Sequence, residues 1–573
     1  MRLPVAVCAV ALWIFGAATG ISAQFDLAQF HPEQDADAAL HACFEAVSKA
    51  GGGSVTIAPG DYHLKGERPV PLCSRTTVNA HAARFHLPET LGDRARIVVF
   101  EGTDVSDFVW SGGHFIGHCF DHRRAPTTPN TWEPNVNTRI LVVHTSQGGV
   151  TERLRFEGIS SERVAGAVIH VEGLAKPGSE SEVATYARGV TVRDCTLVDS
   201  GKFMWDYGLL WQILVWPEEY QPADVAMAQR YFRNEVIRGP VGMSDGDDRV
   251  VFDNSRSPVA VSGIPANATD AARKSLCFYG DALPENVVRG RRYFVVESTP
   301  GFIRVSEQPG GEPLRFRGSA GPGARMMVNL QAAFFELYAP TGAGPGKGGV
   351  DIVCAKQVHV SGCNLSALGD TMHVQRCEDV VFANNHITGS RMGAFFLAEY
   401  CRNAVITGNI VDGTNGSRVI SLEKSSENVT MTGNTFRNGG RGAWINQPRN
   451  LVMVGNVFLN NTTKCEPDPW RGRRTFRTGD WESYPEMYFT LHQANGKYGP
   501  VIVRDNLFVL GPHGSSEVVT FAPGGSGIQF TGNTFVGRPG VISVDPECAD
   551  AVVRDNAGVT LRTESAKAQS GNW

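Results

Sequence analysis

Two glutamates, Glu399 and Glu423, stand 24 residues apart in a part of the chain where a strand pattern returns at about that interval. If successive turns stack in register, the two residues lie one strand spacing apart, about 4.8 Å. Repulsion at that distance raises the pKa of one carboxyl group and leaves the other ionised. Glycosidic bond cleavage needs this combination of an acid and an ionised carboxylate. We therefore predict a catalytic pair, with Asp370 and His373 in the same cleft.

Further side chains fall on the same face when the strands are phased by their apolar residues. The phasing directs four apolar pairs inward: Met372/Val374, Phe396/Ala398, Ile420/Leu422 and Ala443/Ile445. Leu397 and Ser421 then point outward with the catalytic residues, and aromatic rings beside carboxylates can hold the flat face of a sugar. The predicted substrate contacts are Trp205, Asp351, Gln375, Arg418, Lys424, Trp444 and Asn446. The alternative is a solvated surface in which Lys424 or Arg418 bridges the two glutamates.

A repeat in the C-terminal half must position these side chains. Short β-branched runs precede asparagines whose spacing is nearly constant, and the 50-residue interval from Asn456 to Asn506 is interpreted as two turns. The asparagines are Asn385, Asn409, Asn434, Asn456, Asn506, Asn533 and Asn556. Such a period with alternation inside each strand is typical of a β-solenoid. Asparagine tolerates the left-handed backbone of a tight bend, and its amide can bond to the turns above and below. We predict an all-β, right-handed parallel β-helix rather than a β-sandwich.

The N-terminal region supplies a cover for the open end of such a solenoid. Asp35 or Asp37 can cap a helix with Leu40, Cys43, Phe44 and Val47 on one face, and the glycines at 51–53 end it. A strand, a Pro59-Gly60 turn and a second strand follow. This opening resembles the pectate-lyase-like superfamily of carbohydrate-active β-helix enzymes, and with the asparagine repeat the resemblance covers most of residues 30–240 and 330–560. It implies the fold strongly and the reaction only weakly.

The N-terminal segment and the places where the repeat is present or interrupted divide the chain into four parts. Residues 1–23 have the order of a secretory signal peptide. The β-helix is predicted to occupy 24–240 and 331–573, interrupted at 241–330 by short strands with hairpin turns that indicate an inserted antiparallel β-barrel. This segment resembles the barrel inserts of phage-tail and glycan-degrading β-helix proteins. A long loop at 462–486 is rich in Trp, Tyr and Arg.

The composition limits the kinds of molecule that the protein is expected to bind. Charged residues make up 19% of the chain and the formal net charge is −5, so a nucleic-acid partner is not expected. After signal removal no later stretch is apolar enough for a membrane span, which predicts a secreted or periplasmic protein of undetermined oligomeric state. No cofactor is expected, although Asp351 and Asp370 could hold Ca²⁺. His114, His118, Asp121 and His122 group too loosely to predict a metal site.

The sequence leaves the reaction open between three classes. The first is a glycoside hydrolase acting on a polysaccharide or oligosaccharide through Glu399 and Glu423. The second is a uronate lyase, because residues 423–428 resemble the catalytic-lysine stretch of β-helix alginate and chondroitin lyases, and a bulge could bring Lys424 outward in place of Glu423. In those lyases an Arg follows on the next turn, where this chain has Asn446 or Gln447. The third class is a non-catalytic glycan-binding protein.

Overall fold

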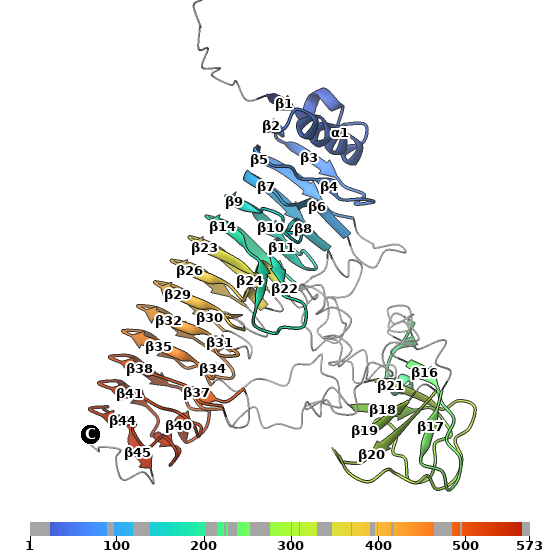
Figure 1. The fold of residues 1–573 in the computed structure, drawn as a ribbon, viewed down its shortest axis with the longest axis vertical. Coiled ribbons are helices and arrows are strands. Elements are labelled where there is room, and N and C mark those ends of the chain that lie inside the picture. The colour runs from blue at the N-terminus through green and yellow to red at the C-terminus, as the bar shows by residue number, and fades with distance from the viewer. Residues whose placement is uncertain are drawn as a thin grey trace, which may run out of the picture.

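A computed structural model of the chain describes most of the predicted solenoid. The described residues are 23–88, 97–118, 138–201, 215–222, 225–226, 238–252, 275–299, 301–308, 310–328, 347–367, 370–389, 396–397, 399–413, 418–462, 484–492 and 496–563. The predicted signal peptide lies almost wholly outside them. Two long parallel sheets run the length of the molecule, and their strands stack turn upon turn from α1 to the C-terminal end (Figure 1). The chain is a right-handed parallel β-helix, as predicted.

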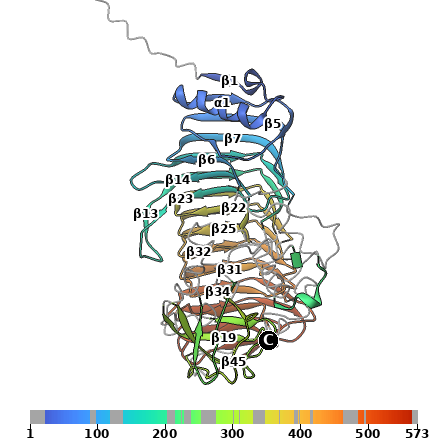
Figure 2. The same cartoon turned by 90° about the vertical axis from the view of Figure 1, so that its right-hand side faces the viewer.

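One of these sheets has 13 strands, one from each turn, and it carries the residues predicted to do chemistry. Its strands face the viewer along the length of the molecule in Figure 2. In stacking order they are β4 (Val70–Pro71), β6 (Ile97–Thr103), β8 (Thr138–His144), β11 (Ala167–Glu172), β22 (Lys347–Val353), β25 (Asp370–Gln375), β28 (Phe396–Leu397), β31 (Ile420–Leu422), β34 (Ala443–Asn446), β37 (Met487–Thr490), β40 (Glu517–Phe521), β43 (Val541–Val544) and β45 (Thr560–Thr563).

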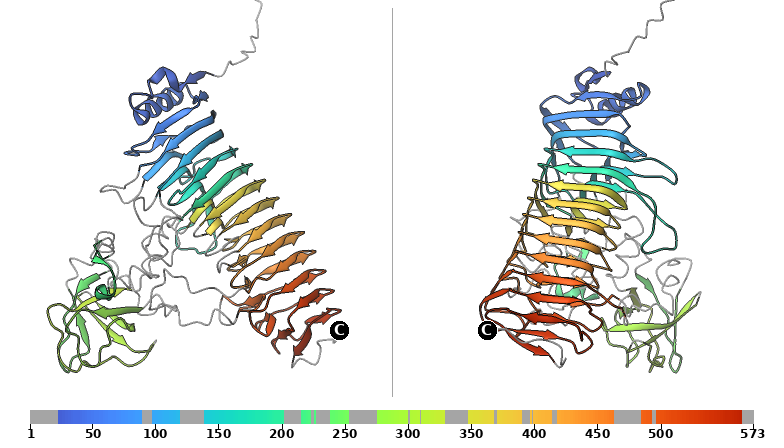
Figure 3. Two further views of the ribbon diagram at one scale, coloured as in Figure 1. Left: turned by 180° about the vertical axis from the view of Figure 1, so that it is seen from behind. Right: turned by 60° about the vertical axis from the view of Figure 1, so that its left-hand side comes forward.

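The other sheet has 24 strands in two columns, which the long strands β5 and β7 join because each spans both (Figure 3). The first column is β1 (Gln24–Asp26), β2 (Gly53–Thr56), β5 (Thr76–His86), β7 (Ser106–Ile116), β9 (Glu152–Glu157), β14 (Ala187–Arg193), β23 (Ala355–Ser361), β26 (Glu378–Ala383), β29 (Arg402–Thr407), β32 (Glu427–Thr432), β35 (Arg449–Val454), β38 (Val501–Arg504), β41 (Ile528–Thr531) and β44 (Val552–Arg554). The second is β3 (Gly60–His63), β10 (Ser160–Glu162), β15 (Thr196–Ser200), β24 (Asn364–Ala367), β27 (His386–Thr388), β30 (Ile410–Asp412), β33 (Thr435–Arg437), β36 (Val457–Leu459), β39 (Leu507–Leu510) and β42 (Thr534–Gly537). Most turns thus contribute three strands around one apolar core.

The predicted cover is present as α1 (Ala36–Lys49), which lies across the N-terminal end of the solenoid (Figure 1). Asp35 is its N-cap and accepts a hydrogen bond from the amide of Ala38 (3.0 Å). The four apolar residues predicted for one face, Leu40, Cys43, Phe44 and Val47, are all fully buried. A short 3-10 helix, η1 (Leu27–Phe30), precedes α1.

A separate antiparallel sheet of six strands falls where the inserted barrel is predicted. Its strands are β16 (Arg238–Pro240), β17 (Arg249–Val251), β18 (Ser275–Tyr279), β19 (Arg292–Thr299), β20 (Phe302–Ser306) and β21 (Arg325–Val328). A bridge between Gly242 and Val251 joins its two edges, and it has a hydrophobic core of its own. The remaining described elements are the hairpin β12 (Leu174–Ala175) and β13 (Val183–Thr185) and the 3-10 helix η2 (Pro217–Glu219).

The asparagine ladder predicted from the repeat is confirmed. Asn434 shows the pattern: its amide nitrogen donates to Asn456 Oδ1 (2.9 Å), and its own Oδ1 accepts from Asn409 Nδ2 (3.0 Å). The left-handed backbone predicted for these asparagines is wrong, since the residue before each of them adopts it instead, for example Gly433 at φ 62°. The ladder residue therefore supplies hydrogen bonds, and the preceding residue makes the bend.

The 50-residue interval between Asn456 and Asn506 is one turn and not the two predicted. Asn456 Nδ2 donates directly to Asn506 Oδ1 (3.0 Å), and β35 pairs with β38 without an intervening strand. The extra residues fall between β36 and β38 in the sequence, and they include most of the loop predicted at 462–486, which lies largely outside the described residues. Spacing alone could not distinguish a second turn from a long excursion.

Glu486, next to the first residue of β37, makes stability depend on pH. Its side chain is fully buried, with one oxygen bonded to the Asn461 amide (3.2 Å), and burial raises its pKa from 4.5 to about 7. Because the folded pKa exceeds the unfolded one, stability is fully present below pH 4.5 and falls as pH rises through 7. We expect the free energy of unfolding to drop by about 3 kcal/mol between pH 4.5 and pH 8 from this group. Denaturant unfolding at several pH values measures it.

The Glu486→Gln variant should lose that part of the pH dependence, because an amide does not titrate. Glu427→Gln, at the half-buried start of β32, is the matched control and should keep the wild-type profile. Equal pH profiles for wild type and Glu486→Gln would contradict this account.

Candidate functional site

Three of the residues predicted for the site, Asp351, His373 and Trp444, lie on one outward-facing row of the 13-stranded sheet. We define the outer row by strand register as His170, Asp351, His373, Phe396, Ser421, Trp444 and Tyr488, each opposite the next. Their neighbours along each strand, such as Ile352 and Val374, belong to the apolar core. Since side chains alternate along a strand, the side chains of His170, Asp351, His373, Ser421, Trp444 and Tyr488 face away from the core. Several members of the row are nevertheless buried.

Asp351 is the centre of a buried hydrogen-bond network. Its Oδ1 contacts His373 Nδ1 (2.7 Å) and its Oδ2 contacts His170 Nδ1 (3.0 Å). Burial alone would raise the pKa of Asp351, but the two imidazoles hold it well below its usual value. Burial would likewise lower the pKa of His170, but Asp351 raises it. The carboxylate is therefore ionised, and it fixes the orientation of both rings.

This network corrects the role predicted for Asp351. Its side chain is completely buried, so it cannot touch a substrate in this conformation and acts as a positioning residue. A Ca²⁺ ion at Asp351 is also not supported, because both carboxylate oxygens already contact imidazoles and Ca²⁺ takes six to eight oxygen ligands. Asp370, the second residue named for that ion, is buried at the start of β25. His373 itself is almost completely buried.

Glu399 carries the ionised carboxylate of the site. Its Oε2 accepts a hydrogen bond from Gln375 Nε2 (2.6 Å), and its Oε1 forms an ion pair with Lys424 Nζ. Burial would raise its pKa, but Lys424 and Gln375 outweigh that effect and the pKa is lowered. The Glu399 side chain keeps 18% of its surface exposed. A partly accessible carboxylate with a lowered pKa suits a base or a nucleophile better than an acid.

The register that leads to this arrangement differs by one residue from the predicted one. Leu397 lies opposite Leu422 and is buried in the core, so the prediction that Leu397 points outward is wrong. All three residues at 396–398 are apolar. Alternation therefore could not decide which of them faces the core, and a slip by one residue reverses every side chain.

The same slip changes the partner of Glu399. The backbone nitrogen of Tyr400 donates to the oxygen of Lys424 (3.2 Å), so the residue beside Glu399 on the next turn is Lys424, and the predicted stacking of Glu399 on Glu423 is wrong. Lys424 and Ser425 have left-handed φ values of 44° and 61°. The bulge that the sequence left open is thus present, and Lys424 occupies the place first assigned to Glu423.

Trp444, Arg418 and Asn446 form the C-terminal part of the site. The Arg418 guanidinium lies 4.2 Å from the centre of the Trp444 ring, and both side chains are half-buried. Thr490 Oγ1 accepts hydrogen bonds from Trp444 Nε1 (2.7 Å) and Asn446 Nδ2 (3.0 Å). Asn446 Oδ1 also accepts from the Lys424 amide (3.2 Å), which ties this group to the bulge. Trp205, predicted in the same column, lies outside the described residues.

Sequence analysis missed the N-terminal continuation of the outer row. His144, Glu172 and His170 lie together on β8 and β11, and Glu101 on β6 reaches His144 (3.4 Å). His144 and Glu172 each lie two residues after the outer-row position of their strand. The turns that contain β8 and β11 have no ladder asparagine, so the repeat could not predict which way these side chains point. The alternating pattern His170-Val171-Glu172 was the available signal. By contrast, His114 contacts Ser160 (2.8 Å) and His118 contacts a backbone oxygen.

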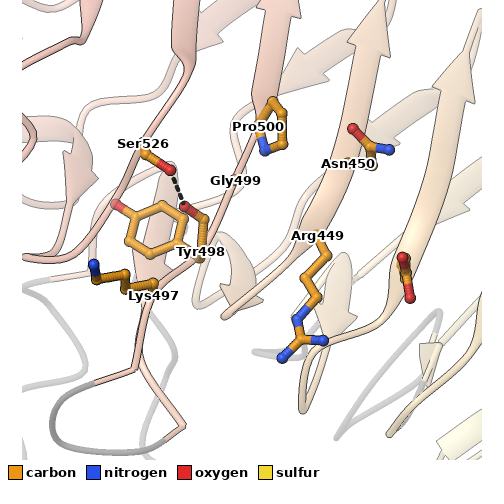
Figure 4. A pocket seen from close by; sticks show the side chains of 8 residues that line it. Arg449, Asn450, Lys497, Tyr498, Gly499, Pro500 and Ser526 are labelled. Atoms are coloured by element: carbon orange, nitrogen blue, oxygen red, sulfur yellow. Dashed lines mark hydrogen bonds between the residues drawn. The ribbon is translucent and has the colours of Figure 1, made fainter.

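A pocket of about 360 Å³ lies on the other sheet (Figure 4). It is lined by Glu427, Arg449, Asn450, Lys497, Tyr498, Gly499, Pro500 and Ser526. Ser526 donates a hydrogen bond to the backbone oxygen of Tyr498 (3.4 Å). Its one carboxylate, Glu427, is ion-paired with Arg402 (3.8 Å), so the pocket offers no acid and base pair.

Comparison with known protein families gives a match to the segment that contains most of this site. Residues 341–481 match the NosD family, described as periplasmic copper-binding proteins. The predicted secreted or periplasmic location agrees with that description. No described helix is long and apolar enough to cross a membrane. No curated protein matches the sequence of the chain.

Several solved β-helix structures are similar over most of the chain. The A-module of the Azotobacter vinelandii mannuronan C-5 epimerase AlgE6 is 10% identical, with 96% of this chain and 99% of that one covered and a TM-score of 0.43. The tailspike protein of E. coli bacteriophage HK620, solved with a pentasaccharide, is 12% identical, with coverages of 93% and 71% and a TM-score of 0.40. PfbA, a surface adhesin of Streptococcus pneumoniae, is 11% identical, with coverages of 94% and 89% and a TM-score of 0.37.

Among the described residues of 341–481, no three His, Cys, Asp or Glu side chains bring their ligand atoms within 4.8 Å of one another, so this part of the chain does not fit a copper site. Copper is bound by thiolates or by groups of imidazoles. Cys354, Cys363, Cys377 and Cys401 are buried there, and burial raises the pKa of Cys377 and raises that of Cys401 to about 12, so these two remain protonated thiols. Cys401 Sγ contacts the Val374 oxygen (3.3 Å). No chemistry through copper follows from these residues.

Proposed function

We propose that the protein is a glycoside hydrolase that acts on a polysaccharide or oligosaccharide along the outer face of the 13-stranded sheet. The observation that carries this proposal is the state of Glu399: a carboxylate with a lowered pKa, held by Gln375 and Lys424 and still partly exposed. Fixing a charged group before the substrate arrives removes the need to reorganise it during the reaction.

In this proposal Glu399 is the base or nucleophile. It either removes a proton from the attacking water or attacks the sugar directly, and the second carboxyl group protonates the leaving oxygen. We assign that acid to Glu423, which precedes Lys424 and whose backbone nitrogen donates to the Leu397 oxygen (3.4 Å) on the previous turn. Lys424 keeps Glu399 ionised, and Gln375 sets the direction of its oxygens.

The substrate would extend along the outer row toward Trp444. Arg418 covers one face of the half-buried Trp444 ring. The opposite face of the ring can stack against the flat face of a sugar. Asn446 is a further hydrogen-bonding group next to the bulge. Asp351 and His373 lie on the N-terminal side of the site, away from Trp444. Their hydrogen bond would fix the position of the His373 ring at that end of the site.

The uronate lyase is the second candidate, and the position of Lys424 favours it. Lys424 reaches into the site as such a base would. Its ammonium group is, however, ion-paired with Glu399, and a lysine acts as a base only in its neutral form. A glycan-binding protein without catalysis would use the same surface.

Incubation of the purified protein with neutral and uronate polysaccharides separates the three classes. A hydrolase releases new reducing ends without near-ultraviolet absorbance, and this is the result we expect. A product that absorbs in the near ultraviolet would establish a lyase. Binding without either signal would establish a non-catalytic protein and overturn the proposal.

A further inference from the structure

Three side chains on β8 and β11 converge on one point, next to the outer row. His144 Nδ1 lies 3.6 Å and His170 Nε2 lies 3.3 Å from the same oxygen, Oε2 of Glu172. One ligand atom from each residue lies within 4.8 Å of the others, and among the described residues these three form the group that meets this condition. The cluster lies outside the segment that matches the NosD family.

We propose that His144, His170 and Glu172 bind a divalent transition-metal ion of the zinc type. Two imidazoles and a carboxylate are ligands that such ions accept, at about 2.0–2.2 Å. Two ligands at that distance from a tetrahedral ion are roughly 3.4 Å apart. Two of the three separations, 3.3 Å and 3.6 Å, match this value, and the ligand atoms of the two histidines lie within 4.8 Å of each other.

The second nitrogen of each histidine is held by another carboxylate. His144 Nε2 contacts Glu101 Oε1 (3.4 Å), and His170 Nδ1 contacts Asp351 Oδ2 (3.0 Å). Metal-bound histidines usually donate their other N–H to a carboxylate, which fixes the ring and its tautomer. Both rings of the cluster show this arrangement, with the ligand nitrogens turned toward Glu172.

Charge also favours a dication at this point. When both imidazoles are neutral, as metal ligands must be, the negative charge of the three carboxylates Glu101, Glu172 and Asp351 exceeds the positive charge of Arg139, which faces His170. An ion with two positive charges would compensate the excess of negative charge with no further group from the chain. Oxygen-preferring ions such as Ca²⁺ are disfavoured, since two of the three ligands are nitrogens.

The exposure of the ligands indicates a site with an open position. His170 is completely buried, whereas the side chains of His144 and Glu172 keep 32% and 25% of their surface exposed. Three protein ligands at a partly accessible position leave the fourth place to water or to a ligand, as in catalytic rather than structural zinc sites. Asp351 also links His170 to His373. This inference does not depend on the proposed glycoside hydrolase activity.

Zinc titration of the full chain tests the proposal. The protein is stripped with a chelator under reducing conditions, and Zn²⁺ binding is measured in competition with a chromogenic chelator. We expect one tightly bound Zn²⁺ per chain and no displacement by millimolar Ca²⁺. His144→Ala and Glu172→Gln should weaken binding at least about 100-fold, and Glu101→Gln about 10-fold to 100-fold. His359→Ala, an exposed histidine on β23, should bind as the wild type does.

The outcomes that overturn the proposal are equally specific. They are an absence of Zn²⁺ binding to the wild type, binding that His144→Ala and Glu172→Gln leave unchanged, or displacement by Ca²⁺. Circular dichroism of each variant shows that it is folded. If a direct ligand variant does not fold, the Glu101→Gln result decides, because its partly exposed side chain is not a ligand.

Discussion

Replacing Glu399 by Gln should lower kcat on the best polysaccharide substrate by about 10²-fold to 10⁴-fold, the range expected for loss of a base or nucleophile. The amide keeps the size of the side chain and a hydrogen-bonding oxygen, but it has neither the negative charge nor the basicity of the carboxylate. Glu399 is ionised because of Lys424 and Gln375, and the uncharged variant no longer pairs with Lys424. Reducing-end release at saturating substrate measures the effect.

Two further variants test whether the loss of activity in Glu399→Gln comes from the loss of a catalytic group or from a general disturbance of the surface. Glu427→Gln, on the other sheet and ion-paired with Arg402, should leave kcat unchanged. Lys424→Gln removes the cation that lowers the pKa of Glu399, so the acidic limb of the kcat/KM profile should move to higher pH. If Glu399→Gln retains wild-type kcat, Glu399 is not the base or nucleophile.

The solenoid could be predicted from the sequence because its defining interactions repeat. Each ladder asparagine serves the same purpose on its own turn, so one residue type recurs at one phase of the pattern. The capping helix was predictable for a similar reason, since a cap, an apolar face and a glycine stop are all local signals. Periodicity and local chemistry determine both features without knowledge of distant contacts.

The site could be predicted only in part, because its contacts depend on register and on distant pairing. The choice between Glu423 and Lys424 rested on a single residue of register at β28, where only apolar residues were available to set the phase. The pairing of His170 with Asp351 joins residues 181 positions apart in the chain, with the inserted antiparallel sheet between them in the sequence. No spacing within the sequence reveals that β11 pairs with β22, the corresponding strand of the next turn, after such an interruption.

The Asn434→Ala variant should lower the free energy of unfolding by about 4 kcal/mol. The Asn434 side chain accepts hydrogen bonds from the backbone and side-chain nitrogens of Asn409 (both 3.0 Å) and donates to the Ile406 oxygen (2.9 Å). Alanine removes these three hydrogen bonds and the one that Asn434 Nδ2 donates to Asn456 Oδ1 (2.9 Å), and each buried group left unsatisfied costs about 1–3 kcal/mol. The position is completely closed to water, so solvent cannot replace the missing amide. Denaturant unfolding followed by circular dichroism measures the change.

Asn364→Ala is the matched control, because Asn364 is exposed at the start of β24 and has the same side chain outside the ladder. We expect it to change the free energy of unfolding by less than about 0.5 kcal/mol. A large difference between the two variants would show that the ladder, and not asparagine content as such, stabilises the stacking of turns. If Asn434→Ala were as mild as Asn364→Ala, the turns would be held by core packing and strand pairing alone, since the stacked phenylalanines of neighbouring turns would remain in both variants.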